Sequence, residues 1–245
     1  MSPVGGVTLP LMTFATAMIL FAHPDDAEFF CGGTVARWVR DGCEVHYVCV
    51  TDGSAGSNEP GTTRASMRVV REREMRAAAE ILGVATVTFL GETDGFLAVT
   101  PDTRRKVTRE VRRLRPEVLV APDPSRLWYG NGYINHADHK AAGELALCAV
   151  MPDAPTRVMF QELEEEGLDP YEVPNLYLSA DEPDTFVEIT DTLAIKLKAL
   201  SAHASQLGPE VEDRVTARAR EVGERGGYQF AEGFKAFRFT DDEDE

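Results

Sequence analysis

Apolar runs alternate with amphipathic segments between residues 17 and 150. Four runs are continuous or rich in β-branched and aromatic residues, as expected of buried strands, and they cover residues 17–22, 45–51, 86–90 and 118–121. The segments between and after these runs have apolar positions at helical spacing or helix-end signals, and they predict helices at 33–40, 64–82, 102–114 and 137–150. Strands that alternate with helices build right-handed βαβ units. The pattern therefore predicts an α/β fold whose mostly parallel sheet has helices on both faces.

The last 90 residues are less regular and predict a C-terminal elaboration of this sheet. Strands are expected at 157–161, 175–178 and 186–189, and helices at 192–205 and 210–222. No internal repeat and no low-complexity linker divides the chain. We therefore expect a single domain over 1–245 with its core at about 15–206, and a disordered acidic tail at 241–245.

Charge and cysteine content exclude several classes of protein. The formal net charge is −16, and the field of such a chain repels both nucleic acid and anionic membrane surfaces. The longest apolar stretch, 14–22, is about half of the ~20 residues that span a bilayer, so it is interpreted as a strand. The cysteines form no CxxC pair, which favours reduced thiols in a cytoplasmic protein; they are Cys31, Cys43, Cys49 and Cys148.

Titratable residues gather where the predicted strands end, which is where ligands bind in open α/β sheets. His23, Asp25 and Asp26 follow the first strand, and Asp94 follows the third. A loop after the fourth strand leads to the segment Asn135-His-Ala-Asp-His139. We expect these groups to lie on one rim of the sheet.

Two imidazoles and one carboxylate, from His23, Asp26 and His139, suit a hydrolytic zinc site with an open position for water. Such a metal lowers the pKa of its water from ~15.7 towards ~7. Asp25 is then a candidate general base, His136 a group that polarises a carbonyl or stabilises its oxyanion, and Asp138 a group that fixes a histidine tautomer.

Each motif also has a simpler interpretation. An HxxH pair on a helix is weak evidence of metal binding when it stands alone, and an Asp-Asp pair after a strand is often a cap or turn. The occurrence of both motifs at two adjacent strand ends argues against coincidence. His46, inside a strand, is interpreted as structural, Cys31 as a packing residue, and His203 either as packing or as a group that reaches the site.

The motifs resemble those of the PIG-L/LmbE-like deacetylases, and the similarity runs over about residues 17 to 206. The segment Ala22-His-Pro-Asp-Asp-Ala-Glu28 with Gly32-Gly-Thr34 is similar to the opening motif of that family, and His136-x-Asp-His139 to a later one. Thr51-Asp-Gly53, Asp94-Gly95 and a helix with Arg71-x-x-Glu74 occur in the family order. Members are zinc-dependent hydrolases with a Rossmann-like three-layer fold, mostly removing acetyl from N-acetylglucosamine units of small conjugates.

The resemblance implies roles for individual residues. His23, Asp26 and His139 would hold the zinc, Asp25 would be the base, and His136, with Asp138 behind it, would assist the tetrahedral intermediate. Arg71 and Asp94 match positions that contact the sugar. Ile134 stands where some members have a tyrosine near the oxyanion, so Tyr133 or Tyr129 is a candidate substitute.

The expected function is therefore hydrolysis of an N-acetylglucosamine-type conjugate by zinc-activated hydroxide, with an Asp as general base. Zn²⁺ is the expected metal, with Fe²⁺ as another option, and the expected partner is a small amino-sugar substrate. The resemblance also implies a possible homo-oligomer. A metal-dependent phosphoesterase and a non-catalytic sugar-binding protein are the alternatives, although a phosphoesterase normally uses a second metal or several cationic groups.

Overall fold

A computed structural model describes residues 13–129, 132–208 and 210–239, and it contains a seven-stranded sheet in the order β3-β2-β1-β4-β7-β9-β8. Its five parallel strands are β1 (Thr16–Phe21), β2 (Glu44–Thr51), β3 (Thr86–Glu92), β4 (Val118–Pro122) and β7 (Asn175–Ser179). The two remaining strands are β8 (Thr185–Glu188) and β9 (Ala231–Arg238), and β9 runs antiparallel to both of its neighbours. The predicted mostly parallel α/β sheet is confirmed.

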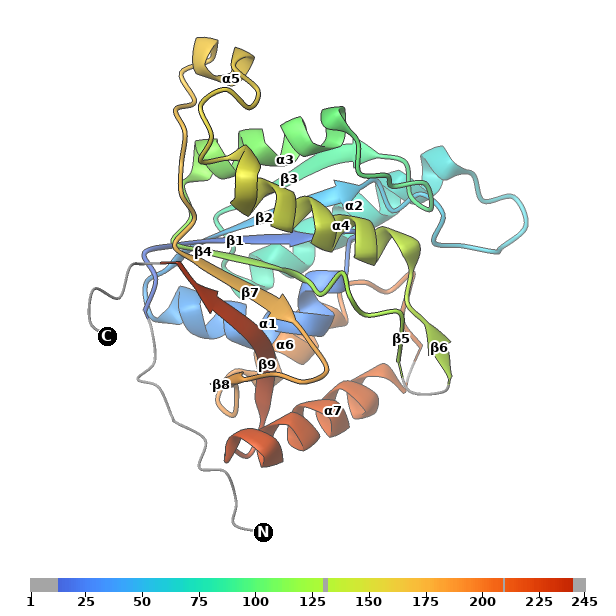
Figure 1. Ribbon diagram of the computed structural model, residues 1–245. Helices are drawn as coiled ribbons and strands as arrows, with labels where there is room; N and C mark the ends of the chain where they lie inside the picture. The colour runs from blue at the N-terminus through green and yellow to red at the C-terminus, as the bar shows by residue number, and fades with distance from the viewer. Residues whose placement is uncertain (1–12, 130–131, 209, 240–245) are drawn as a thin grey trace.

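Helices cover both faces of the sheet (Figure 1). They are α1 (Asp26–Arg40), α2 (Arg64–Leu82), α3 (Pro101–Leu114), α4 (Ala137–Cys148), α5 (Glu162–Glu165), α6 (Leu193–Leu200) and α7 (Val211–Gly226), with one wider helical turn at Ala149–Asp153. Alternate residues of β1 pack on opposite faces, because successive side chains of a strand point in opposite directions. Ile19 packs with α1 and α2, whereas Leu20 packs with α3 and α4. A central strand that is buried on both faces explains the continuous apolar run in the sequence.

The order of the strands reverses between β1 and β4. The chain passes from β1 outward through β2 to β3, and it then crosses back to place β4 on the other side of β1. In doubly wound sheets this point leaves a crevice at the carboxyl ends of the two strands. The motifs after β1 and β4 are therefore brought together.

The C-terminal part of the chain extends the sheet at the β7 edge. β9 lies between β7 and β8, and α7 packs against β8 and β9 (Figure 1). Strand β9 was not predicted from the sequence, nor was the separate two-stranded hairpin of β5 (Trp128–Tyr129) and β6 (Tyr133–Ile134). No helix in the described ranges is long and apolar enough to cross a membrane. The predicted disordered tail, 241–245, lies outside the described residues.

The strand predicted at 157–161 is wrong, because these residues form turns. The guanidinium group of Arg112 on α3 donates to the backbone oxygens of Asp153, Thr156 and Met159. These carbonyl groups are therefore engaged by a side chain instead of a neighbouring strand. Val158 points outward and is 70% exposed, so the alternation seen in the sequence does not reflect a buried face.

The largest corrections to the predicted helix boundaries are at α1 and α6. Helix α1 begins at Asp26 and not at residue 33, because it continues through Gly32 and Gly33 with a kink at Cys31. Helix α6 ends at Leu200 and not at residue 205. The residues after it form turns, and Ser205 is held there by the side chain of Glu74.

Candidate active site

Three ligand-type side chains meet at the carboxyl ends of β1 and β4. His23 Nδ1 lies 3.2 Å from His139 Nε2 and 3.5 Å from an Asp26 carboxylate oxygen. The other Asp26 oxygen is 3.1 Å from His139 Nε2. All three side chains are buried, and their ligand atoms form a group compact enough to hold a metal ion. The structure therefore brings together the three residues that the sequence singled out as metal ligands.

Local structure at the start of two helices positions this trio. Asp26 opens α1, and its carboxylate accepts a hydrogen bond of 2.8 Å from the backbone N–H of His23. His139 lies in the first turn of α4, which begins after His136. The side chain of His136 caps that helix by accepting from the backbone N–H of Asp138. The first turns of two helices thus present Asp26 and His139 to one crevice, and His23 comes from the segment between β1 and α1.

The outward nitrogens of the two imidazoles are held by other polar groups. His23 Nε2 is 3.2 Å from Asp94 and 3.3 Å from Asp138, and His139 Nδ1 is 2.9 Å from the side-chain oxygen of Asn135. Metal-binding histidines usually donate their second ring N–H to such acceptors, which fixes the tautomer and the ring orientation. Asn135 was not among the site residues predicted from the sequence. Its position four residues before His139 was the feature of the sequence from which this contact could have been predicted.

Asp94, Asp138, His136 and the outer nitrogen of His23 form a second group of ligand-type side chains. Asp138 already accepts from the backbone N–H groups of Gly95 and Leu97, and Asp94 accepts from that of Ala55. Burial acts to raise the pKa of Asp94, but its contacts with His23 and with backbone donors bring that pKa down to about 2. These carboxylates are thus ionised and already hydrogen-bonded, which suits them to hold His23 in place.

Asp25 lies beside the trio and is paired with a buried arginine. One oxygen of Asp25 is 2.9 Å from Arg71 Nη2, which also donates to the backbone oxygen of Pro24. Burial raises the pKa of Asp25 to about 6, against the opposing effect of the Arg71 charge. The backbone of Asp25 has a φ of 126°, a conformation that is uncommon for a residue with a side chain and that is found at functional sites.

His136 lines the same crevice with a partly exposed ring. Its ring is 4.7 Å from that of His23, centroid to centroid. Burial and the neighbouring His23 lower the pKa of His136, which favours the neutral imidazole. Because Nδ1 accepts the capping hydrogen bond, the proton of the neutral ring is placed on Nε2.

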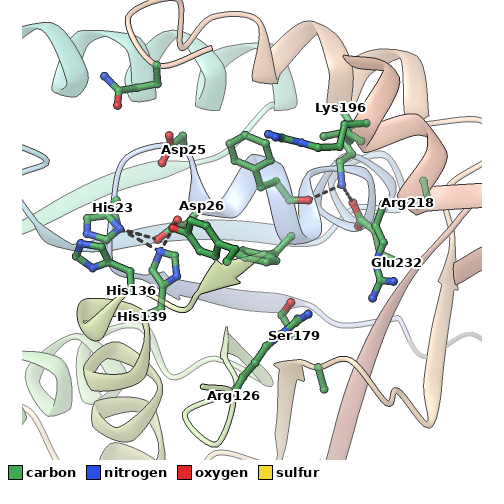
Figure 2. A pocket seen from close by; sticks show the side chains of 18 of the residues that line it. His23, Asp25, Asp26, Arg126, His136, His139, Ser179, Lys196, Arg218 and Glu232 are labelled. Atoms are coloured by element: carbon green, nitrogen blue, oxygen red, sulfur yellow. Dashed lines mark hydrogen bonds and ion pairs between the residues drawn. The ribbon is translucent and has the colours of Figure 1, made fainter. Parts of the chain in front are cut away.

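A pocket of about 760 Å³ contains the trio, Asp25 and His136, together with Arg71, Asp94 and Tyr133. Figure 2 shows His23, His136 and His139 at one end and Arg126, Ser179 and Arg218 away from them. Tyr133 is 55% exposed at the pocket wall. The side chain of Tyr129 lies outside the described parts of the structure. The wall from α7 and β9 was not predicted from the sequence, because these segments contain no recognisable motif.

The two other histidines are not among the residues that line this pocket. His46, on β2, has Nδ1 2.9 Å from the hydroxyl of Thr86 on β3, which agrees with the structural role predicted for it. His203 is fully buried, and its Nε2 is 3.0 Å from a carboxylate oxygen of Glu28. Of the two interpretations left open for His203, the structure shows packing and hydrogen bonding.

Comparison with known proteins defines the class. The family model described as "PIG-L: GlcNAc-PI de-N-acetylase" matches residues 18–150, and the chain belongs to this PIG-L family. The diacetylchitobiose deacetylase of Thermococcus kodakarensis is 31% identical over 218 residues, which cover 87% of this chain and 79% of the relative. The segment matched by the family model includes β1, α1, β4 and α4, which carry the trio.

Solved structures agree with this assignment. The N,N'-diacetylchitobiose deacetylase of Pyrococcus horikoshii, crystallised with an inhibitor, superposes with a TM-score of 0.85 at 29% identity, covering 92% of this chain and 84% of that one. The 4-carboxy-2-hydroxymuconate hydratase GalB of Pseudomonas putida has a TM-score of 0.75 at 25% identity, with 94% and 99% coverage. The fold thus occurs with more than one chemistry, and the activity has to be argued from the site.

Proposed function

We propose that this protein is a metal-dependent N-deacetylase that hydrolyses the acetamido group of an N-acetylglucosamine-type conjugate. The observation that carries the proposal is the His23, Asp26 and His139 trio with Asp25 beside it, at one end of a pocket. Membership of the PIG-L family and the similarity to two diacetylchitobiose deacetylases support the same substrate class.

The residues present fit a divalent metal ion. Two imidazole nitrogens and one carboxylate oxygen face one another, and the outer nitrogens of both rings are already held by acceptors. This donor set leaves room for water, as in catalytic zinc sites, so we propose Zn²⁺ and accept Fe²⁺ as a substitute. A metal held by these residues would supply Lewis acidity for the acetyl carbonyl and would lower the pKa of a nearby water.

Asp25 is the proposed general base. Its carboxylate lies beside the metal ligands, and a pKa of about 6 makes it both ionised and a useful proton acceptor near neutral pH. It would take a proton from the attacking water and deliver it to the leaving amine. Free amino sugar and acetate are then the two products.

His136 is the proposed donor to the carbonyl oxygen. The hydrogen bond at Nδ1 directs the ring proton to Nε2, which favours a neutral N–H donor over a cation. Such a donor stabilises the negative charge that develops on the oxygen as water attacks. Asp138 supports this arrangement in two ways. Its carboxylate contacts His23 Nε2, and its backbone N–H donates the capping hydrogen bond to His136 Nδ1.

Arg71, Asp94 and Tyr133 are proposed to contact the sugar, since all three line the pocket. Arg71 also has a second role. It contacts Asp25, and the positive charge of Arg71 favours the ionised form of the Asp25 carboxylate. Asp94 likewise contacts His23. The cytoplasmic location and the homo-oligomer remain predictions from the sequence.

The experiment that tests this proposal is an acetate-release assay with N-acetylglucosamine conjugates, run beside a hydration assay and a phosphodiester assay. We expect stoichiometric acetate and free amine from at least one conjugate, and no comparable turnover in the other two assays. Faster hydration or phosphodiester cleavage would contradict the proposal. Tight sugar binding without acetate release by the zinc-loaded protein would instead favour a non-catalytic binding protein.

A further inference from the structure

The pocket extends well beyond the groups that the hydrolysis of an acetamido bond requires. Its opposite wall is built largely from α7, a helix outside the segment matched by the family model. At about 760 Å³, the pocket lies in the upper part of the ~300–1,000 Å³ range typical of small-molecule sites. A substrate that fills it has a second part, attached to the amino sugar, which lies against α7.

Helix α7 presents a cationic and apolar face to this space. Arg214 and Arg218 are one helical turn apart, and Val215, Ala219 and Val222 on the same face also line the pocket. Residues three or four apart on a helix are neighbours, so the two guanidinium groups are placed side by side above an apolar strip. Figure 2 shows Arg218 at the end of the pocket away from His23 and His139.

The two arginines differ in how their charge is used. Arg218 pairs with Asp181 at 3.4 Å and with Glu221 at 2.9 Å. Arg214 forms no ion pair with any residue in the described ranges, and it is exposed on the pocket wall. The cationic wall is unexpected in a chain with a net charge of −16, whose segment 158–195 contains acidic residues and neither lysine nor arginine.

The other cationic side chains that line the pocket already form ion pairs. Arg71 is paired with Asp25, and Lys196 is paired with Glu232 and donates to the backbone oxygen of Phe29. Arg126, which also lines the pocket, is paired with Asp181. Among the described residues that line the pocket, Arg214 is therefore the cation without an ion pair. A guanidinium group binds carboxylate or phosphate oxygens in a bidentate manner and more strongly than neutral hydroxyl groups.

We propose that Arg214, assisted by Arg218, recognises an anionic group on the aglycone of the substrate. The substrate class is then an N-acetylglucosamine conjugate whose second part carries a carboxylate or a phosphate and enough apolar surface to pack on Val215 and Ala219. This inference rests on the proposed deacetylase function. Arg214 and Arg218 are specificity residues, and they take no part in the proton transfers.

The test compares matched glycosides of N-acetylglucosamine that differ only in the terminal group of the aglycone. A carboxypropyl glycoside, its carboxamide and a phosphopropyl glycoside are assayed with the wild-type protein, the Arg214→Gln variant and the Arg214→Gln/Arg218→Gln double variant. Arg220→Gln is the control, because Arg220 lies on the same helix and stacks on Phe230 without lining the pocket. Its substitution removes the same charge as Arg214→Gln.

We expect the wild type to prefer one or both anionic glycosides over the carboxamide by about tenfold or more in kcat/KM, as lost charge-assisted hydrogen bonds usually imply. The double variant should lose this preference, because kcat/KM should fall more for the anionic glycosides than for the carboxamide. Arg220→Gln should keep the preference. Whether the wild type has the higher kcat/KM for the carboxypropyl or for the phosphopropyl glycoside shows whether the site prefers a carboxylate or a phosphate. Equal kcat/KM for all three glycosides, or an equal loss on all three in the variants, would overturn the proposal.

A binding measurement separates this inference from the proposed function. The corresponding free glucosamine glycosides are titrated calorimetrically into the same proteins, without any turnover. If no conjugate releases acetate but the wild type still binds the anionic glycoside more tightly, and the double variant does not, the anion subsite stands and the deacetylase proposal fails. If the affinities are equal, the anion subsite fails whatever the activity.

Discussion

The β1/β4 end of the pocket and its C-terminal wall both contain buried charged residues, but these residues make different kinds of contacts. At the β1/β4 end, ligand-type atoms of His23, Asp26 and His139 converge on one point. Asp94 and Asp138 contact the other ring nitrogen of His23. At the C-terminal wall, Lys196 and Glu232 form one closed ion pair 2.5 Å apart. Convergent groups can accept a ligand, whereas a satisfied pair holds elements together.

The Lys196–Glu232 pair connects three elements of the fold. Glu232, on β9, also accepts hydrogen bonds from the backbone N–H groups of Gly33 and Thr34, which the kink of α1 at Cys31 makes available. Lys196 comes from α6 and donates to Phe29 of α1. We therefore expect substitutions at the β1/β4 end to affect the reaction, and substitutions of this pair to affect stability.

The largest expected effect is that of Asp25→Asn on turnover. Loss of a general base typically lowers the rate by about 10²–10⁴-fold. Asparagine tolerates the positive φ at this position, so the backbone and the metal content should be unchanged. The measurement is kcat for acetate release together with metal analysis of the same sample. Asp41→Asn, at the exposed C-terminal end of the same helix, is the control and should keep wild-type activity. Loss of the metal in Asp25→Asn would make Asp25 a ligand.

The next largest effect is expected for Glu232→Ala on the free energy of unfolding. Removing one partner leaves Lys196 buried without its counter-ion, which typically costs about 3–5 kcal/mol. The measurement is denaturant unfolding, compared with Asp184→Ala. Asp184 pairs with Lys235 at the surface, where such pairs contribute about 0–1 kcal/mol. Equal destabilisation by the two variants would remove the distinction between a buried structural pair and a surface pair.

A smaller effect is expected for Asn135→Ala on metal affinity. Losing the acceptor at His139 Nδ1 should weaken metal binding about 10–100-fold, as for other groups that orient metal ligands. Asn135→Asp keeps an acceptor for His139 but loses the amide that donates to the backbone oxygen of Arg126. Competition with a metallochromic chelator measures both variants. If Asn135→Asp binds metal as weakly as Asn135→Ala, loss of the hydrogen bond to His139 does not explain the weaker metal binding.

The β1/β4 end was predictable because its residues obey two short-range rules. Buried parallel strands are recognised as apolar runs, and ligand-type residues directly after them are placed on one rim by the sheet itself. The reversal of strand order between β1 and β4 then brings His23 and His139 together, as predicted from the sequence. The detailed contacts, such as Asn135 on His139 and Arg71 on Asp25, depend on side-chain directions that residue types alone do not specify.

The C-terminal wall was less predictable because its contacts are long-range. Strand β9 contains Glu232, which a sequence pattern treats as exposed, yet its carboxylate is buried against α1 and Lys196. Outside this wall, the turns at 157–161 contact Arg112 through the backbone oxygen of Met159, and Arg112 looks like a surface arginine on a charged helix. Both features depend on pairing between residues more than 30 positions apart in the chain.

We propose that one metal ion held by His23, Asp26 and His139 is required for acetate release. The most direct measurement strips the protein with a chelator and then titrates zinc back while metal content and acetate release are followed on the same sample. We predict that activity disappears on stripping and returns in proportion to bound zinc, reaching its maximum at about one ion per chain, as expected for a mononuclear hydrolytic site. Acetate release that persists in the metal-free protein, or that requires two ions per chain, would contradict the account.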